Sequence, residues 1–182
     1  ATSRIAFVSG QGRYSEIYVM DYDGANVRPF TRDGSTALFP AWSPDGRKIA
    51  YVSFMTGIPN IHIRSYPEGI PLPFPTFPQG TTISPTFSPD GRWIAFCSSK
   101  DSNSTQLYVA SADGSTIRQL TNERGVIHSS PRWNPRTGRE IAFISNRSGT
   151  PQIYIVDADG ANLRRVLDLG GFADSPAWSP DG

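Results

Sequence analysis

A repeat of about 45 residues is the feature that most constrains what this chain can fold into. One short motif recurs four times, as Arg4-Ile5-Ala6-Phe7, Lys48-Ile49-Ala50-Tyr51, Trp93-Ile94-Ala95-Phe96 and Glu140-Ile141-Ala142-Phe143. The isoleucines of these motifs are 44, 45 and 47 residues apart. A fixed period of this length is typical of an array in which each repeat forms one supersecondary unit and stacks on its neighbours.

Each repeat predicts four short antiparallel strands. A Ser-Pro-Asp-Gly turn, as at residues 43–46, joins a first strand to a second, because proline presets φ and glycine accepts the positive φ that closes a hairpin. A third strand alternates apolar and polar residues, as at 106–109, and an Asp-Gly turn leads into a shorter fourth strand, as at 117–121. With no helical periodicity, the chain predicts an all-β β-propeller of about four blades, each of four antiparallel strands.

The 182 residues predict one propeller domain with repeats at 1–36, 37–81, 82–127 and 128–172 and a closing strand at 173–182. The chain begins with the second strand of a blade, Arg4 to Ser9. It finishes with a segment that matches the first strand and turn of one. We therefore expect the C-terminal strand to pair with the N-terminal blade and close the ring. The pattern leaves open whether this closure occurs within one chain or across a dimer.

Composition argues against several classes of partner. Seventeen basic and sixteen acidic residues leave a net charge of +1, and the arginines are scattered singly, so no basic stripe is present to bind nucleic acid. No apolar run is long enough to span a bilayer, and no signal-peptide pattern is found, so we predict no membrane insertion. Cys97 lies in a strand pattern and is expected to be a small core residue.

The motifs of catalysis and cofactor binding are missing from the sequence. There is no Gly-x-Ser-x-Gly elbow, no His-Glu-x-x-His and no complete phosphate-binding glycine loop. Turn geometry explains the many Asp-Gly carboxylates, and no calcium-loop pattern accompanies them. We therefore predict a protein that is not an enzyme, with no cofactor and no metal site, although the sequence does not decide whether a metal occupies the central channel.

The mouth of the central channel is the candidate site, because a propeller gathers one loop from each blade there. The candidate partner-binding residues lie where the chain enters each innermost strand: Leu38, Phe39, Ile83, His128, Ser129 and Asp174. The alternative is that Leu38, Phe39 and Ile83 pack between blades.

A large aromatic residue occupies one register in every repeat: Trp42, Phe87, Trp133 and Trp178. Such a repeated position favours the core between blades over an aromatic binding surface.

The segments Pro40-Ala41-Trp42-Ser43-Pro44-Asp45-Gly46 and Ile17-Tyr18-Val19-Met20-Asp21-Tyr22-Asp23-Gly24 resemble the TolB-like β-propeller repeat family over essentially the whole chain. The resemblance implies a periplasmic, non-catalytic scaffold of the Tol-Pal cell-envelope system. Such a scaffold would bind a protein or peptide partner such as a peptidoglycan-associated lipoprotein. This chain departs from that family in having no N-terminal α/β domain and four blades where the family has six.

Two other functions remain open from the sequence. Similar repeats occur in the propellers of prolyl-oligopeptidase-like and tricorn-like peptidases, so the chain could be a gating propeller fragment of a peptidase or hydrolase. It could also be a truncated or engineered propeller with no function of its own.

Overall fold

The computed structural model describes residues 3–10, 12–100, 104–166 and 170–182, and this part of the chain contains strands, turns and loops but no helix. None of its segments is therefore a helix that could cross a membrane. The strands are β1 (Arg4–Ser9), β2 (Glu16–Asp21), β3 (Arg28–Pro29), β4 (Ala37–Trp42), β5 (Lys48–Ser53), β6 (Asn60–Ser65), β7 (Leu72–Pro73), β8 (Thr82–Phe87), β9 (Trp93–Ser98), β10 (Gln106–Ser111), β11 (Ile117–Gln119), β12 (His128–Trp133), β13 (Glu140–Ser145), β14 (Gln152–Asp157) and β15 (Arg164–Arg165).

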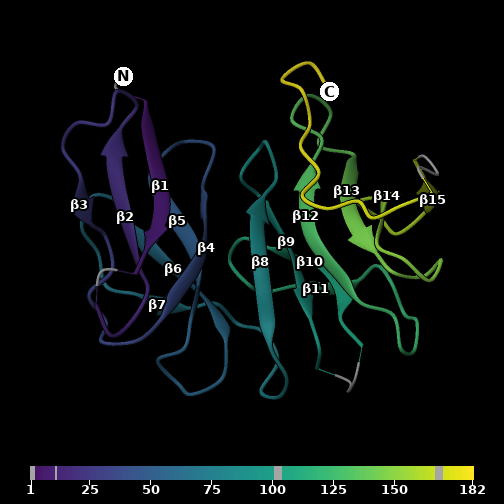
Figure 1. The fold of residues 1–182 in the computed structure, drawn as a ribbon, viewed down its shortest axis with the longest axis horizontal. Helices are drawn as coiled ribbons and strands as arrows, with labels where there is room; N and C mark the ends of the chain where they lie inside the picture. Colours follow the sequence, from purple (N-terminus) through teal and green to yellow (C-terminus); the bar gives the residue numbers. More distant parts are fainter. Residues whose placement is uncertain (1–2, 11, 101–103, 167–169) are drawn as a thin grey trace.

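The strands form four antiparallel sheets that follow one another along the chain (Figure 1). The first blade is β1-β2-β3, the second β4-β5-β6-β7, the third β8-β9-β10-β11 and the fourth β12-β13-β14-β15. The innermost strands β4, β8 and β12 contact one another in sequence. The predicted all-β propeller of about four blades is confirmed.

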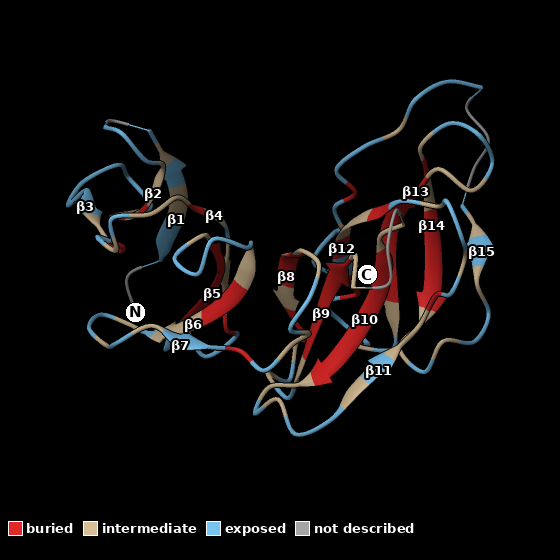
Figure 2. Ribbon diagram, turned by 90° about the horizontal axis from the view of Figure 1, so that it is seen from below, coloured by how far each residue is buried: buried red, intermediate tan, exposed pale blue. Residues whose placement is uncertain are grey.

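The core lies between successive blades, and in the second, third and fourth blades the second and third strands are largely buried, whereas β1 of the first blade is not (Figure 2). Strand β9 shows the pattern, because it is buried from Ile94 to Ser98. Phe87 and Trp133 are buried in two of these clusters and Trp42 packs against the third, as predicted for their register, whereas Trp178 belongs to none of the three. Cys97 is fully buried, as its strand pattern predicted.

The C-terminal segment does not close the ring, and this part of the prediction was wrong. Residues 173–182 contain no strand and do not pair with β1. The segment lies instead on the fourth blade, beside β12 and away from the N-terminal blade (Figure 1). The backbone N–H of Ala173 donates to Pro151 O at 3.0 Å, and Trp178 Nε1 donates to Arg132 O at 2.9 Å.

These contacts repeat those that β12 makes with the third blade. His128 N donates to Thr105 O at 2.9 Å, and Trp133 Nε1 donates to Thr86 O at 3.2 Å. The repeat thus places each innermost strand against the preceding blade. Residues 173–178 therefore pack against the fourth blade in the way that each innermost strand packs against the blade before it. These contacts with the fourth blade hold the segment in place.

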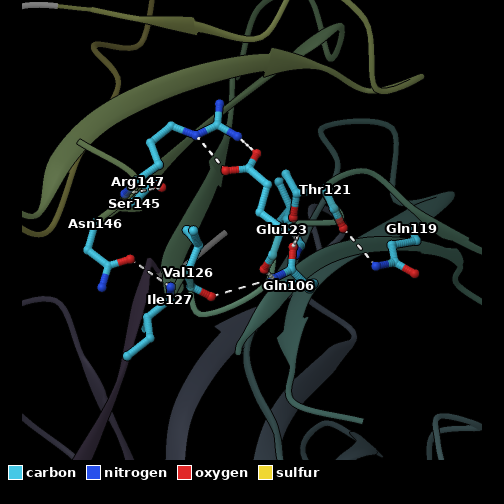
Figure 3. A network of polar contacts seen from close by, with 10 residues as sticks. Gln106, Gln119, Thr121, Glu123, Val126, Ile127, Ser145, Asn146 and Arg147 are labelled. Atoms are coloured by element: carbon cyan, nitrogen blue, oxygen red, sulfur yellow. Dashed lines mark hydrogen bonds and ion pairs between the residues drawn. The ribbon is translucent and has the colours of Figure 1, made fainter. Parts of the chain in front are cut away.

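Side-chain hydrogen bonds order the loop that leads from the third blade into β12 (Figure 3). Gln106 Nε2 donates to Glu123 O at 2.7 Å, and Gln106 Oε1 accepts from the Glu123 N–H at 3.1 Å. The Glu123 carboxylate pairs with Arg147 of the fourth blade, and Ile127 N donates to Asn146 Oδ1 at 2.8 Å. The network ties neighbouring blades together and fixes where the innermost strand begins.

Candidate binding site

Each innermost strand carries a β-bulge at its centre. Leu38 pairs with Val52 and Ala41 pairs with Ala50, so β4 has one more residue than β5 between these pairs. Strands β8 and β12 show the same register shift. The bulged residues Phe39 (54°), Ser84 (56°) and Ser130 (53°) have positive φ and precede a proline. Ser175 (53°), in the C-terminal segment that forms no strand, has the same φ before Pro176. Proline has no N–H, so the bulge adds no unpaired donor at that position.

The bulges line a cavity of about 440 Å³ that is shared by all four inner segments. Its walls are Phe39, Pro40, Ala41, Trp42, Ser84, Pro85, Thr86, Ser130, Arg132 and Ser175. Serine and threonine hydroxyls, two aromatic rings and one guanidinium thus face a common space. Sites that combine apolar walls with a few convergent polar groups are typical of ligand recognition.

Arg132 is the only charged group among the described residues that line this cavity. The other inner segments carry Ala41, Thr86 and Ala177 at its position. Arg132 Nη1 donates to Pro131 O at 2.8 Å, and no described carboxylate forms an ion pair with the guanidinium. Surrounding protein desolvates the group and lowers the pKa of Arg132. The residue is nevertheless exposed to solvent, so the guanidinium is open to an anionic ligand, with which it can form charge-assisted hydrogen bonds.

Of the six predicted site residues, one lines the 440 Å³ cavity and the others lie outside its lining. Phe39 lines the cavity and is 48% exposed. Leu38, Ile83 and Ser129 are half-buried in ladder pairs and lie outside its lining. Asp174 is exposed outside the lining as well, and its Oδ1 accepts from the Ser175 N–H at 2.7 Å.

The expectation that His128 rings the channel mouth was wrong, because its side chain is fully buried. Its ring meets Phe143 edge-on with centroids 5.2 Å apart. Burial lowers the pKa of His128 to about 4, so the imidazole is neutral. The first position of an innermost strand faces the core, and the bulge two residues later turns the chain towards the cavity. The residue before each repeated proline is the signal that would have found Ser84, Ser130 and Ser175.

A larger cavity of about 680 Å³ lies between the third and fourth blades, near the Ser-Pro-Asp-Gly turns. Several of its charged groups already have protein partners. Arg92 Nε lies 2.7 Å from Asp90 Oδ2, and Arg118 Nη2 donates to Ala158 O at 2.7 Å. The first contact lies within one turn and the second joins the third blade to the fourth, so both arginines are already engaged and we place the candidate site at the inner strands.

The chain matches the family model described as the TolB beta propeller domain over residues 1–182. It is 40% identical over 149 residues to the Tol-Pal system protein TolB of Bordetella pertussis, a match that covers 81% of this chain and 33% of that protein. The chain thus spans about a third of the length of the curated relatives it matches.

Solved structures give the same relationship. TolB from Acinetobacter baumannii superimposes with a TM-score of 0.80 and 31% identity, covering 93% of this chain and 42% of that one. A prolyl endopeptidase superimposes with a TM-score of 0.62 over 90% of this chain and 27% of its own, but at 14% identity this likeness concerns the fold alone. The chain belongs to the TolB β-propeller family.

Proposed function

We propose that this chain is a non-catalytic module that binds an extended, acidic segment of a protein partner in the inner-strand cavity. The observation that carries the proposal is Arg132, a solvent-exposed cation in the cavity lining with no described counter-charge, at a position where the other repeats have Ala or Thr. A carboxylate of the partner would accept two parallel hydrogen bonds from the guanidinium.

The rest of the cavity supplies groups suited to a peptide backbone. Hydroxyls of Ser84, Ser130 and Ser175 can donate to or accept from main-chain amides, and Phe39 and Trp42 offer apolar contact area at one end. The four inner segments form a preordered wall, so binding orders few protein side chains. A segment of a folded partner, inserted in extended form, fits this arrangement.

The relatives are named for the Tol-Pal system, and we propose that the partner is a peptidoglycan-associated lipoprotein and that the site of action is the periplasm. A gating role in a peptidase is the second function considered from the sequence. It has no support beyond the shared fold, because the likeness to peptidase propellers lies at 14% identity.

Isothermal titration with the soluble domain of the Bordetella pertussis peptidoglycan-associated lipoprotein tests the proposal. Replacing Arg132 by Ala should raise the dissociation constant roughly 10- to 100-fold, because a charge-assisted hydrogen bond contributes about 1.5–3 kcal/mol to binding. Arg136→Ala is the matched control, since Arg136 lines the 680 Å³ cavity instead and should leave the affinity unchanged. Equal affinities for wild type and Arg132→Ala, or a loss confined to Arg136→Ala, would contradict the proposed site.

A further inference from the structure

The 680 Å³ cavity has a counterpart one blade earlier in the chain. This counterpart, of about 380 Å³, lies between the second and third blades. Equivalent positions of the repeat line both cavities, with Phe87 and Ala112 in the smaller one and Trp133 and Ala158 in the larger one. Comparing the two cavities therefore separates the residues that every blade needs from those that only the larger cavity has.

Trp93 distinguishes the larger cavity from its counterpart. It is the first residue of β9 and lines the larger cavity, whereas Lys48, the first residue of β5, lines the smaller one. The other two repeats have Arg4 and Glu140 at this position, so the blade accepts a charged residue there. The Trp93 side chain is half-buried and packs against the core cluster between the third and fourth blades. Its indole gives the cavity a flat apolar surface that the fold does not require.

Arg136 is the second departure from the repeat, and it comes from a different blade. In the third blade the turn is closed by Asp90, whose Oδ1 accepts from the Arg92 N–H at 3.0 Å. In the fourth blade Asn134 Oδ1 has this role and accepts from the N–H groups of Arg136 and Thr137, each at 3.1 Å. Arg136 follows the turn proline, as Asp90 does in the third blade. The fourth turn is therefore closed without the side chain of Arg136.

The loss of the turn carboxylate leaves a second arginine without a partner. Arg92, which follows the turn glycine of the third blade, lies with its Nε 2.7 Å from Asp90 Oδ2. Arg139 holds the same place in the fourth blade, but its turn has no aspartate. No described residue forms an ion pair or a hydrogen bond with the guanidinium of Arg136 or of Arg139, and both residues are exposed. Two unpaired guanidiniums and the Trp93 indole thus line one cavity.

Two carboxylates in the same lining supply hydrogen-bond acceptors. Asp157 Oδ2 accepts from Asn162 Nδ2 at 2.6 Å, and Asp159 Oδ1 accepts from the Ala161 N–H at 2.9 Å. The other oxygen of each carboxylate receives no hydrogen bond from the part of the chain that the structure describes. Four arginines and three aspartates line the cavity in all, so its charge balance is positive.

We propose that this cavity is a second binding site and that its ligand is a sugar bearing a carboxylate or a phosphate. The C–H face of the sugar ring stacks on Trp93, and the guanidiniums of Arg136 and Arg139 hold the acid group through charge-assisted hydrogen bonds. The free oxygens of Asp157 and Asp159 accept from ring hydroxyls. An aromatic anion would also suit the indole and the arginines, but it has no hydroxyls for the carboxylates.

The sugar site is independent of the function proposed above. The cavity has a volume in the range of small-ligand sites, and none of its lining residues lines the inner-strand cavity. The two cavities therefore take different ligands, and failure of one proposal leaves the other standing.

The test follows the tryptophan indole N–H signals of the 182-residue chain in ¹⁵N–¹H NMR spectra during titration with glucuronic acid and, separately, with glucose 6-phosphate. At least one of these acids should shift the Trp93 signal with saturation and leave the Trp42 signal in place, and the tighter of the two identifies the acid group. Glucose has no charge and inorganic phosphate has no ring, so each should bind at least about tenfold more weakly. Equal affinity for glucose or for inorganic phosphate, or no Trp93 shift with either acid, would overturn the proposal.

Two substitutions then test the contacts. Trp93→Lys introduces the residue of the second repeat, and Arg136→Ala removes a guanidinium from a turn that Asn134 closes. Each should raise the dissociation constant at least about tenfold, read from the indole signal of Trp133, which lines the same cavity. Arg47→Ala is the matched control, because Arg47 is the exposed arginine after the turn of the second blade and lines neither cavity. Affinity retained in Trp93→Lys or in Arg136→Ala, or an equal loss in Arg47→Ala, would contradict the site.

Discussion

Burial of His128 predicts that the stability of this protein falls in mildly acidic solution. The imidazole is fully buried, and neither ring nitrogen has a hydrogen-bond partner. Burial lowers its pKa from 6.5 to about 4, so the folded state binds fewer protons than the unfolded state in this range. The contribution of His128 to stability is therefore fully present above about pH 6.5 and is lost as pH falls towards about 4.

The size of the effect follows from the two pKa values. Between about pH 7.5 and 5.0 the shift removes about 2 kcal/mol from the free energy of unfolding, a large part of the stability of a single domain. The variant His128→Leu replaces the unpaired ring with an apolar side chain of similar size. It should be at least as stable as wild type at about pH 7.5 and should lose less stability at about pH 5.0.

Urea unfolding followed by tryptophan fluorescence at the two pH values measures both quantities. Thr, the residue of the third repeat at Thr82, provides a second substitution that the fold already accepts at this position. If wild type, His128→Leu and His128→Thr lose the same stability between the two pH values, the explanation from a buried neutral histidine is refuted.

Three further results are expected. Gln106→Ala leaves the Glu123 N–H without its side-chain acceptor and should cost about 1–3 kcal/mol in urea unfolding, whereas exposed Arg124→Ala should change little. Gly80→Ala should destabilise the fold by more than Gly57→Ala, because a Cβ at Gly80 meets backbone at 2.6 Å while one at Gly57 meets nothing within 4 Å, although both have positive φ; thermal unfolding compares them. The Cys97 thiol, whose pKa is raised by complete burial, should react with a thiol reagent only on unfolding, and rapid labelling of the native protein would contradict this.

The blades could be predicted because their signals are local. The turn at residues 43–46 and the alternation at 106–109 each specify a hairpin or strand from a few neighbouring residues, and the structure has strands in the expected places. The blade against which residues 173–178 pack depends on contacts between segments far apart in the sequence. No local sequence pattern encodes such contacts. The segment has the same sequence features whether it pairs with β1 or lies on the fourth blade.

The site was predicted less well because a bulge changes which side chains face the cavity. A shift of one residue moves a strand's side chains to the opposite face, so placing the site at His128 and Ser129 missed Ser130 and Arg132. Arg132 gave no motif signal, since a lone arginine among scattered arginines stands out only when its surroundings are known. Its importance comes from its place in the cavity lining and from the missing counter-charge, which are properties of the folded structure.

The most direct test of the account follows the four tryptophan indole N–H signals in a ¹⁵N–¹H NMR spectrum while the soluble lipoprotein domain is added. Trp42 lines the inner-strand cavity, whereas Trp93 and Trp133 line the cavity between the third and fourth blades. Binding at the proposed site predicts that the Trp42 signal shifts with saturation while that of Trp93 stays in place. Shifts of Trp93 and Trp133 with an unchanged Trp42, or no shift at any of the four, would contradict a partner site at the inner strands.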